Sequence, residues 1–259
     1  MTVYAQTPVA LLRQMRDAGY PASEIVAVGR ASDLAARLFA GLHRASGKPF
    51  VAHLTGTASV LASIGSPLRL VVAGILHATY VLGRFGDGPS GATPSRRALL
   101  AGSIGGSAEE IVFRYATLPW EQGETNGSSM TMDRLDPLER DVVVARLANE
   151  VEEAIDCGIL FHLDGESRRA LYLAATPRWS AWARQLGHEP LARALEDAAD
   201  SLAREADPGA LRCDRRATYA PAPLEKPTAA GRTRAVALGV ARAASRVRRA
   251  MALAAKGRS

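Results

Sequence analysis

Apolar residues recur every three or four positions through much of the chain, which is the spacing of helices that bury one face. Runs of Val, Ile, Thr and Tyr typical of strands are scarce, whereas Ala and Leu, which favour helices, are abundant. The pattern therefore predicts an all-α fold. The first predicted helix runs from Pro8 to Gly19, and the second starts at Ser32 or Asp33. Two more helices cover 50–64 and 68–82, and the next starts at Ser107 in a capping box with Glu110. A long helix covers 137–157, and further helices start at Arg168, at Trp179 and at Pro190, the last ending near Glu205.

Charge and composition divide the chain of 259 residues. Its net charge is +6, yet the stretch from Lys226 to Arg258 holds nine Lys and Arg residues and no Asp or Glu, so the remainder is mildly acidic. We expect one helical domain over 1–206, a flexible linker rich in Pro and Ala over 207–231, and a basic amphipathic helix over 232–259. This tail is expected either to bind nucleic acid or an anionic membrane surface, or to be a disordered, solubilising extension.

The cysteine count and the hydropathy indicate a cytoplasmic protein. Cys157 and Cys213 are too few for a disulfide framework and are not spaced as a metal knuckle. The first residues lack the basic-then-apolar order of a secretory signal, and the most apolar stretch, 68–82, is interrupted by Arg69 and His77. We therefore expect no transmembrane segment.

Two of the five histidines are the first candidates for chemistry. His53 shares a predicted helix face with Thr57 and Val60, and His77 shares one with Leu70 and Ala73. An isolated histidine on such a face is often a hydrogen-bonded core residue. Two inward-facing histidines on neighbouring helices also predict a shared site.

Residues 43–80, "HRASGKPFVAHLTGTASVLASIGSPLRLVVAGILHATY", resemble the start of an HD domain, specifically the guanosine tetraphosphate hydrolase domain of the Rel/SpoT type. In that family an Arg-Lys-Ser-Gly-Glu-Pro-Tyr stretch precedes a first metal-binding histidine, and a later helix ends in His-Asp. The matching residues here are Arg44, Ser46, Gly47, Pro49 and Phe50, then His53 and His77. The resemblance implies an HD-like helical domain in which His53 and His77 are ligands of a divalent metal, and Fe, Mn or Zn is the metal expected if the protein is an enzyme of an HD-related branch.

The departures from that family concern its carboxylates. Ala78 stands where the His-Asp dyad has aspartate, and the hydrolytic Glu-Asp pair falls at Val81 and Leu82. The last ligand, an aspartate on a later helix, corresponds to Asn149 in "RLANEVEEAID". Two histidines and an amide are a poor ligand set for a divalent metal. Without the metal or a carboxylate base, hydrolysis lacks both its nucleophile and its proton acceptor.

Other residues of the motif predict a polar pocket. Arg44 matches the arginine that stacks on the base in the family, and Tyr80 and Asn149 are expected to join it in contacting a ligand. Arg44 as a solvated loop residue and Tyr80 as a core aromatic are the alternatives.

Acidic residues elsewhere have simpler explanations. Four acidic residues precede or open a predicted helix: Asp133, Asp136, Glu139 and Asp141. The dipole of a helix favours negative charge at its N-terminus, and we prefer this explanation to a role of these residues as replacement metal ligands. Glu150, Glu152 and Glu153 are interpreted as a solvated helix face. His162 and Asp164 supply a further ligand only if their loop folds over the pocket.

Two functions remain open. The first is a binding or accessory module for a polar or phosphorylated small molecule, with an HD-like fold and a degenerate metal site. The second is a metal-dependent phosphohydrolase or oxygenase of an HD-related branch that uses His53 and His77. These sequence patterns do not decide whether the protein is an enzyme.

Overall fold

The computed structural model describes residues 4–118, 120, 131–212 and 218–220, and it confirms the all-α prediction. The chain divides into two units, 1–220 and 221–259, and the second, with the predicted basic tail, lies outside the described residues. The helices of the N-terminal half are α1 (Pro8–Asp17), α2 (Ala22–Leu38), α3 (Phe50–Ser63), α4 (Leu68–Leu76), α5 (Thr79–Leu82), α6 (Pro94–Ile104) and α7 (Gly106–Thr117). Those of the C-terminal half are α8 (Pro137–Ile155), α9 (Gly165–Gln185) and α10 (Glu189–Arg204), with short 3₁₀ turns η1 (Met132–Arg134), η2 (Gly158–Phe161) and η3 (Gly209–Leu211).

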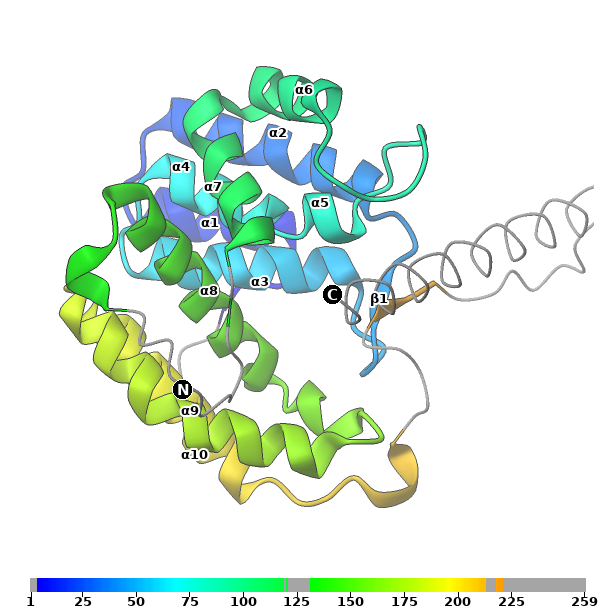
Figure 1. The fold of residues 1–259 in the computed structure, drawn as a ribbon, viewed down its shortest axis with the longest axis vertical. Coiled ribbons are helices and arrows are strands. Elements are labelled where there is room, and N and C mark those ends of the chain that lie inside the picture. The colour runs from blue at the N-terminus through cyan, green and yellow to red at the C-terminus, as the bar shows by residue number, and fades with distance from the viewer. Residues whose placement is uncertain (1–3, 119, 121–130, 213–217, 221–259) are drawn as a thin grey trace, which may run out of the picture. The chain divides into compact units, whose positions relative to one another are not determined.

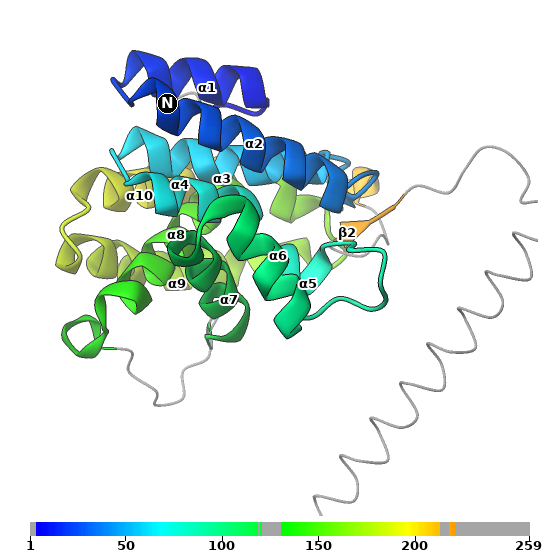
Figure 2. The ribbon, with the colours of Figure 1, turned by 90° about the horizontal axis from the view of Figure 1, so that it is seen from above.

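Helix α3 lies at the centre of this unit. It packs against α1, α4 and α8, and Figures 1 and 2 show α1 and α2 on one side of α3 and α4, with α8, α9 and α10 on the other. Polar side chains in its middle are buried as well, and two of them bond locally: Thr55 donates to the carbonyl of Val51 and Thr57 to that of His53. A helix buried all round needs such internal partners, because burying an unpaired hydroxyl is costly.

Several predicted helix starts are wrong for identifiable reasons. Helix α2 begins at Ala22 after Pro21, so Ser32 is not its cap but a buried mid-helix residue that donates to the carbonyl of Val28. Helix α7 starts after Gly105, which has a φ of 87°, and the predicted Ser107 cap does not form. The predicted helix 68–82 is interrupted at His77 and Ala78.

The C-terminal half shows the opposite kind of error, because its helices continue where breaks were expected. Helix α9 is continuous through Pro177, so the separate helices predicted from Arg168 and Trp179 are one. Helix α8 agrees closely with prediction, and Asp136 and Glu139 form a reciprocal capping box at its start. The helix-end explanation of these two acidic residues is therefore correct.

A two-residue sheet joins distant parts of the chain. Strand β1 (His43–Arg44) pairs antiparallel with β2 (Thr218–Tyr219), with His43 opposite Tyr219 and Arg44 opposite Thr218. Strand β2 and η3 both lie within 207–231, the stretch predicted as a flexible linker. The C-terminal side of the folded unit thus returns to the loop that carries Arg44. Among the described helices, none is both long and apolar enough to cross a membrane.

The contact between α3 and α4 depends on a glycine. A Cβ atom on Gly74 would lie 2.6 Å from Cδ1 of Leu61 and 3.3 Å from Cα of Ala58. We expect Gly74→Ala to lower the free energy of unfolding by about 1–3 kcal/mol through overpacking, despite the better helix propensity of Ala. Gly102→Ala on α6, where a Cβ meets nothing within 4 Å, is the control and should raise stability slightly. Thermal unfolding that shows Gly74→Ala to be as stable as wild type would refute the close approach.

Candidate functional site

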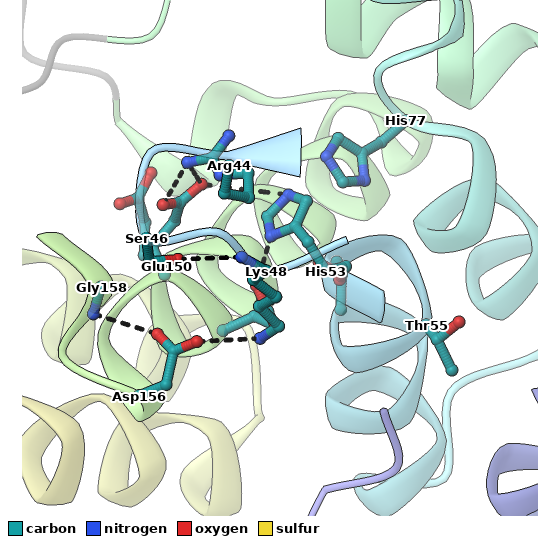
Figure 3. A network of polar contacts seen from close by, with 12 residues as sticks. Arg44, Ser46, Lys48, His53, Thr55, His77, Glu150, Asp156 and Gly158 are labelled. Atoms are coloured by element: carbon teal, nitrogen blue, oxygen red, sulfur yellow. Dashed lines mark hydrogen bonds and ion pairs between the residues drawn. The ribbon is translucent and has the colours of Figure 1, made fainter. Parts of the chain in front are cut away.

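Helices α3 and α4 bring His53 and His77 face to edge in the core. Their ring centroids are 5.4 Å apart with the planes at 77°, and both side chains are buried. Nδ1 of His77 lies 2.8 Å from the carbonyl oxygen of Gly74 and donates to it, so its Nε2 carries no proton when the ring is neutral. Figure 3 shows the His77 ring directed toward His53. The predicted meeting of the two imidazoles is confirmed.

A buried carboxylate from α8 completes this group. Glu152, which is 1% exposed, contacts Nδ1 of His53 with one oxygen and Nζ of Lys48 with the other. Gly56 makes room for it, because a Cβ there would lie 2.6 Å from Cγ of Glu152. Lys48 also reaches Oδ2 of Asp156 at 3.5 Å, and Figure 3 shows Lys48 between α3 and the end of α8.

Burial sets the protonation of this pair. It lowers the pKa of His53 to about 3, although the charge of Glu153 opposes the shift. It raises the pKa of Glu152 to about 8, against the influence of Lys48. The pKa of His77 is also lowered well below its usual value, by burial and by the neighbouring His53. At neutral pH both imidazoles are therefore neutral, and Glu152 and His53 share one proton between them.

A second ion pair lies beside the first. Nη2 of Arg44 donates to both carboxylate oxygens of Glu153, and Oε1 of Glu153 lies 3.9 Å from Nε2 of His53. Asp156 accepts from the backbone N–H of Gly158 at 3.0 Å. Arg44 and Lys48 thus balance the negative charges of Glu153 and Asp156, while the proton shared with His53 neutralises Glu152.

Two cavities adjoin these ion pairs. A small one of about 10 Å³, enough for one water molecule, is lined by Arg44, Ser46, Lys48, His53, Glu152, Glu153, Asp156, Gly158 and His162. A larger one of about 290 Å³ is lined by Arg44, Glu150, Glu153, Ile159, Asp164, Arg168, Leu171, Tyr172 and Trp179. We call the larger one the α9 cavity. Arg44 and Glu153 belong to the walls of both, so the ion pair lies between the small cavity, which His53 lines, and the α9 cavity.

The residues predicted for the pocket are only partly brought together. Arg44 and His53 line the small cavity together, and His53 contacts His77. His162 also lines the small cavity, as expected if its loop folds over the site. Tyr80 donates instead to Glu109 at 2.6 Å, and neither Tyr80 nor Asn149 lines the two cavities. Their role as ligand contacts stays a prediction.

The interpretation of Glu150, Glu152 and Glu153 as a solvated face is wrong. Glu150 and Glu152 are buried and Glu153 is half-buried. A signal was present in the sequence, because Val144, Ala148 and Glu152 follow one another at intervals of four and so share one helix face. Lys48 was missed because its partner on α8 lies 104 residues away.

The donor set does not fit the metal that the HD resemblance implies. Within 4–118, 120, 131–212 and 218–220, no three His, Cys, Asp or Glu side chains are arranged to hold a metal ion. Nδ1 of His53 and the carboxylates of Glu152 and Glu153 are engaged with one another or with Lys48 and Arg44. A divalent cation would have to displace those contacts before it could bind these side chains.

Comparison with known families finds one match. Residues 35–119 match the sequence model of a family described as a domain of unknown function, DUF6817. The match spans Arg44, His53 and His77 but ends before α8, which supplies Glu152 and Glu153. Among curated proteins, none matches the sequence.

The shared proton makes stability depend on pH in a specific way. Folded, the pair of His53 and Glu152 holds one proton between pH 3 and 8. Unfolded, with pKa values of 6.5 and 4.5, it holds two protons below pH 4.5 and none above pH 6.5. The pair therefore adds stability as pH rises toward 4.5 and removes stability as pH rises above 6.5.

Chemical denaturation of wild type and Glu152→Gln at pH 6.5 and pH 8 measures this loss. We expect the decline to shrink in Glu152→Gln and to persist in Glu196→Gln, which removes an exposed carboxylate paired with Arg184. An equal decline in wild type and Glu152→Gln would contradict the buried, proton-sharing pair.

Proposed function

We propose that this chain is a small-molecule binding module built on an HD-like helical scaffold, and that its ligand is a polar or phosphorylated molecule held beside Arg44. The position of Arg44 carries the proposal. Arg44 lines both the small cavity, which His53 also lines, and the α9 cavity. The backbone of Arg44 pairs with β2, and its guanidinium donates to Glu153. These two contacts fix the position of Arg44.

Three features support the HD-like scaffold. Successive helices α3 and α4 carry His53 and His77, and the two rings face each other. A later helix, α8, brings carboxylates to the same point, as the last ligand helix does in HD domains. The loop before α3 turns Arg44 back over the site, and Nη2 of Arg44 reaches α8.

Binding is better supported than hydrolysis. At the positions where the related hydrolases carry their catalytic carboxylates, this chain has Val81 and Leu82, and Val81 is 56% exposed. His53 is neutral, buried and bonded to Glu152, so it is poorly placed to accept a proton from a water attacking a substrate in the larger cavity. The remaining chemistry is recognition by charge and by hydrogen bonds.

Arginine is suited to such recognition. A guanidinium presents a planar fork of N–H donors that matches the oxygens of a phosphate or carboxylate. Arg44 is now engaged with Glu153, and Arg168, on the exposed side of the α9 cavity, is engaged with Asp164. An anionic group of a ligand would compete with these two carboxylates for the same donors.

One observation favours the alternative, a metal-dependent phosphohydrolase or oxygenase. His77 donates from Nδ1 to a backbone carbonyl, the arrangement that orients histidine ligands of metals through Nε2. Metal content separates this alternative from the binding module.

Binding of pyrophosphate and GDP tests the role of Arg44. We expect both probes to raise the melting temperature of the full chain and to bind at least about tenfold more weakly to Arg44→Gln, because charge-assisted bonds are lost. The double variant Arg44→Gln/Glu153→Gln should show the same loss without leaving Glu153 unpaired. The control is Arg69→Gln, which removes an arginine that pairs with Asp141 and lines a different cavity. This variant should bind both probes as wild type does. Calorimetry that finds no binding to wild type, or equal binding to Arg44→Gln, would overturn the proposal.

A further inference from the structure

A turn after α8 brings one histidine to the small cavity. The chain passes through η2 to His162, whose carbonyl accepts from the backbone N–H of Gly165 at 3.0 Å. Gly158, at the start of η2, lies against the loop that carries Arg44, because a Cβ there would be 3.3 Å from Cβ of Ser46. The backbone thus holds the side chain of His162 at the small cavity, which it lines.

The imidazole of His162 is buried without a partner. The residue is 7% exposed, and within the described part of the chain its ring takes part in no hydrogen bond or ion pair. Its nitrogens are not among the unpartnered polar atoms that are sealed from solvent, so the ring is open to the cavity that it lines. The other cationic or imidazole side chains of this cavity, Arg44, Lys48 and His53, all contact carboxylates. A buried polar group without a partner is uncommon and indicates that something else binds it.

His162 also lies within reach of charges that line the α9 cavity. Burial lowers the pKa of its imidazole most, and the charges of Arg168 and Arg44 lower this pKa further. The carboxylates of Asp164 and Glu153 oppose the shift. All four charged residues line the α9 cavity, so His162 lies near the boundary between the two cavities. At pH 7 its ring is neutral and offers one N–H donor.

We infer that His162 binds the ligand together with Arg44, and that the group which they hold is a terminal phosphate with three unesterified oxygens. The guanidinium fork of an arginine binds two oxygens of a phosphate. The N–H of His162 takes a third oxygen in the small cavity, whose volume of about 10 Å³ admits one such atom. The fourth oxygen joins the phosphate to the rest of the ligand, which occupies the α9 cavity. This inference rests on the proposed function, since it assumes that an anionic group binds Arg44.

Glu153 is the group that has to move when the phosphate binds. It now occupies the donors of Arg44, and its side chain is 20% exposed, whereas that of Glu152 is 1% exposed. Glu153 can therefore turn toward solvent without breaking the buried contact between Glu152 and His53. This movement frees the guanidinium and joins the two cavities, because Arg44 and Glu153 line both.

GDP and the methyl ester of its terminal phosphate test this inference by calorimetry on the full chain. The two molecules share the nucleoside and both phosphorus atoms, and the ester lacks one free oxygen and one charge. We expect wild type to bind GDP about tenfold more tightly than the ester. His162→Phe keeps a ring but removes the N–H, so it should weaken GDP about tenfold and leave the affinity for the ester nearly unchanged.

A second histidine supplies the matched control. His188 is half-buried and lines neither cavity, so His188→Phe should bind GDP as wild type does. NMR of wild type labelled with ¹⁵N at histidine is an independent readout if His162→Phe unfolds. We expect GDP to move the imidazole signals of His162, identified by their absence in His162→Gln, and to leave those of His188 in place.

Other results would overturn the inference. It fails if GDP leaves the His162 signals unmoved, if His162→Phe binds GDP as tightly as wild type, if the ester binds as tightly as GDP, or if GDP does not bind. The proposed function is judged separately, because Arg44-dependent binding of pyrophosphate or GDP would stand even when His162 takes no part.

Discussion

The contact of Glu152 with Lys48 and His53 is the constraint on which the site depends. A carboxylate that is 1% exposed is stable only with close partners, and here it takes one from α3 and one from the loop before α3. Glu152 thereby joins α8 to His53 on α3, 99 residues away in the chain, and Gly56 leaves the space that the carboxyl group occupies. The orientation of His53, and with it the geometry of the pair with His77, follows from this contact.

The same principle extends to the outer side of the site. Arg44 and Glu153 form a second ion pair beside the first, and β2 pairs with the strand that carries Arg44. Arginine and lysine side chains carry the charge that compensates these carboxylates, and they place a guanidinium at the edge of a cavity of about 290 Å³. Compensation by side chains is the physical basis for proposing recognition in place of hydrolysis.

Much of the fold could be predicted from local signals. Pro137 with the preceding Asp136, and the apolar run after Pro49, mark the starts of α8 and α3 because they act within one turn of the chain. Boundaries set by tertiary contacts were missed: α9 continues through Pro177, and α2 begins ten residues before the predicted cap. Packing, which sequence periodicity does not report, decides such cases.

The site was predictable for its histidines and not for its carboxylates. His53, His77 and Arg44 belong to one short motif, whereas Glu152 and Glu153 lie on a helix whose charged residues look solvated when their distant partners are unknown.

The metal content of the full chain tests the central claim most directly. Elemental mass spectrometry would be applied to protein purified without a metal-affinity column, for wild type, His53→Ala and His77→Ala. The account predicts far less than one Fe, Mn or Zn per chain in wild type, with no difference in the variants, because Lys48 and Arg44 already neutralise the carboxylates. Near-stoichiometric metal in wild type that disappears in both folded variants would contradict it.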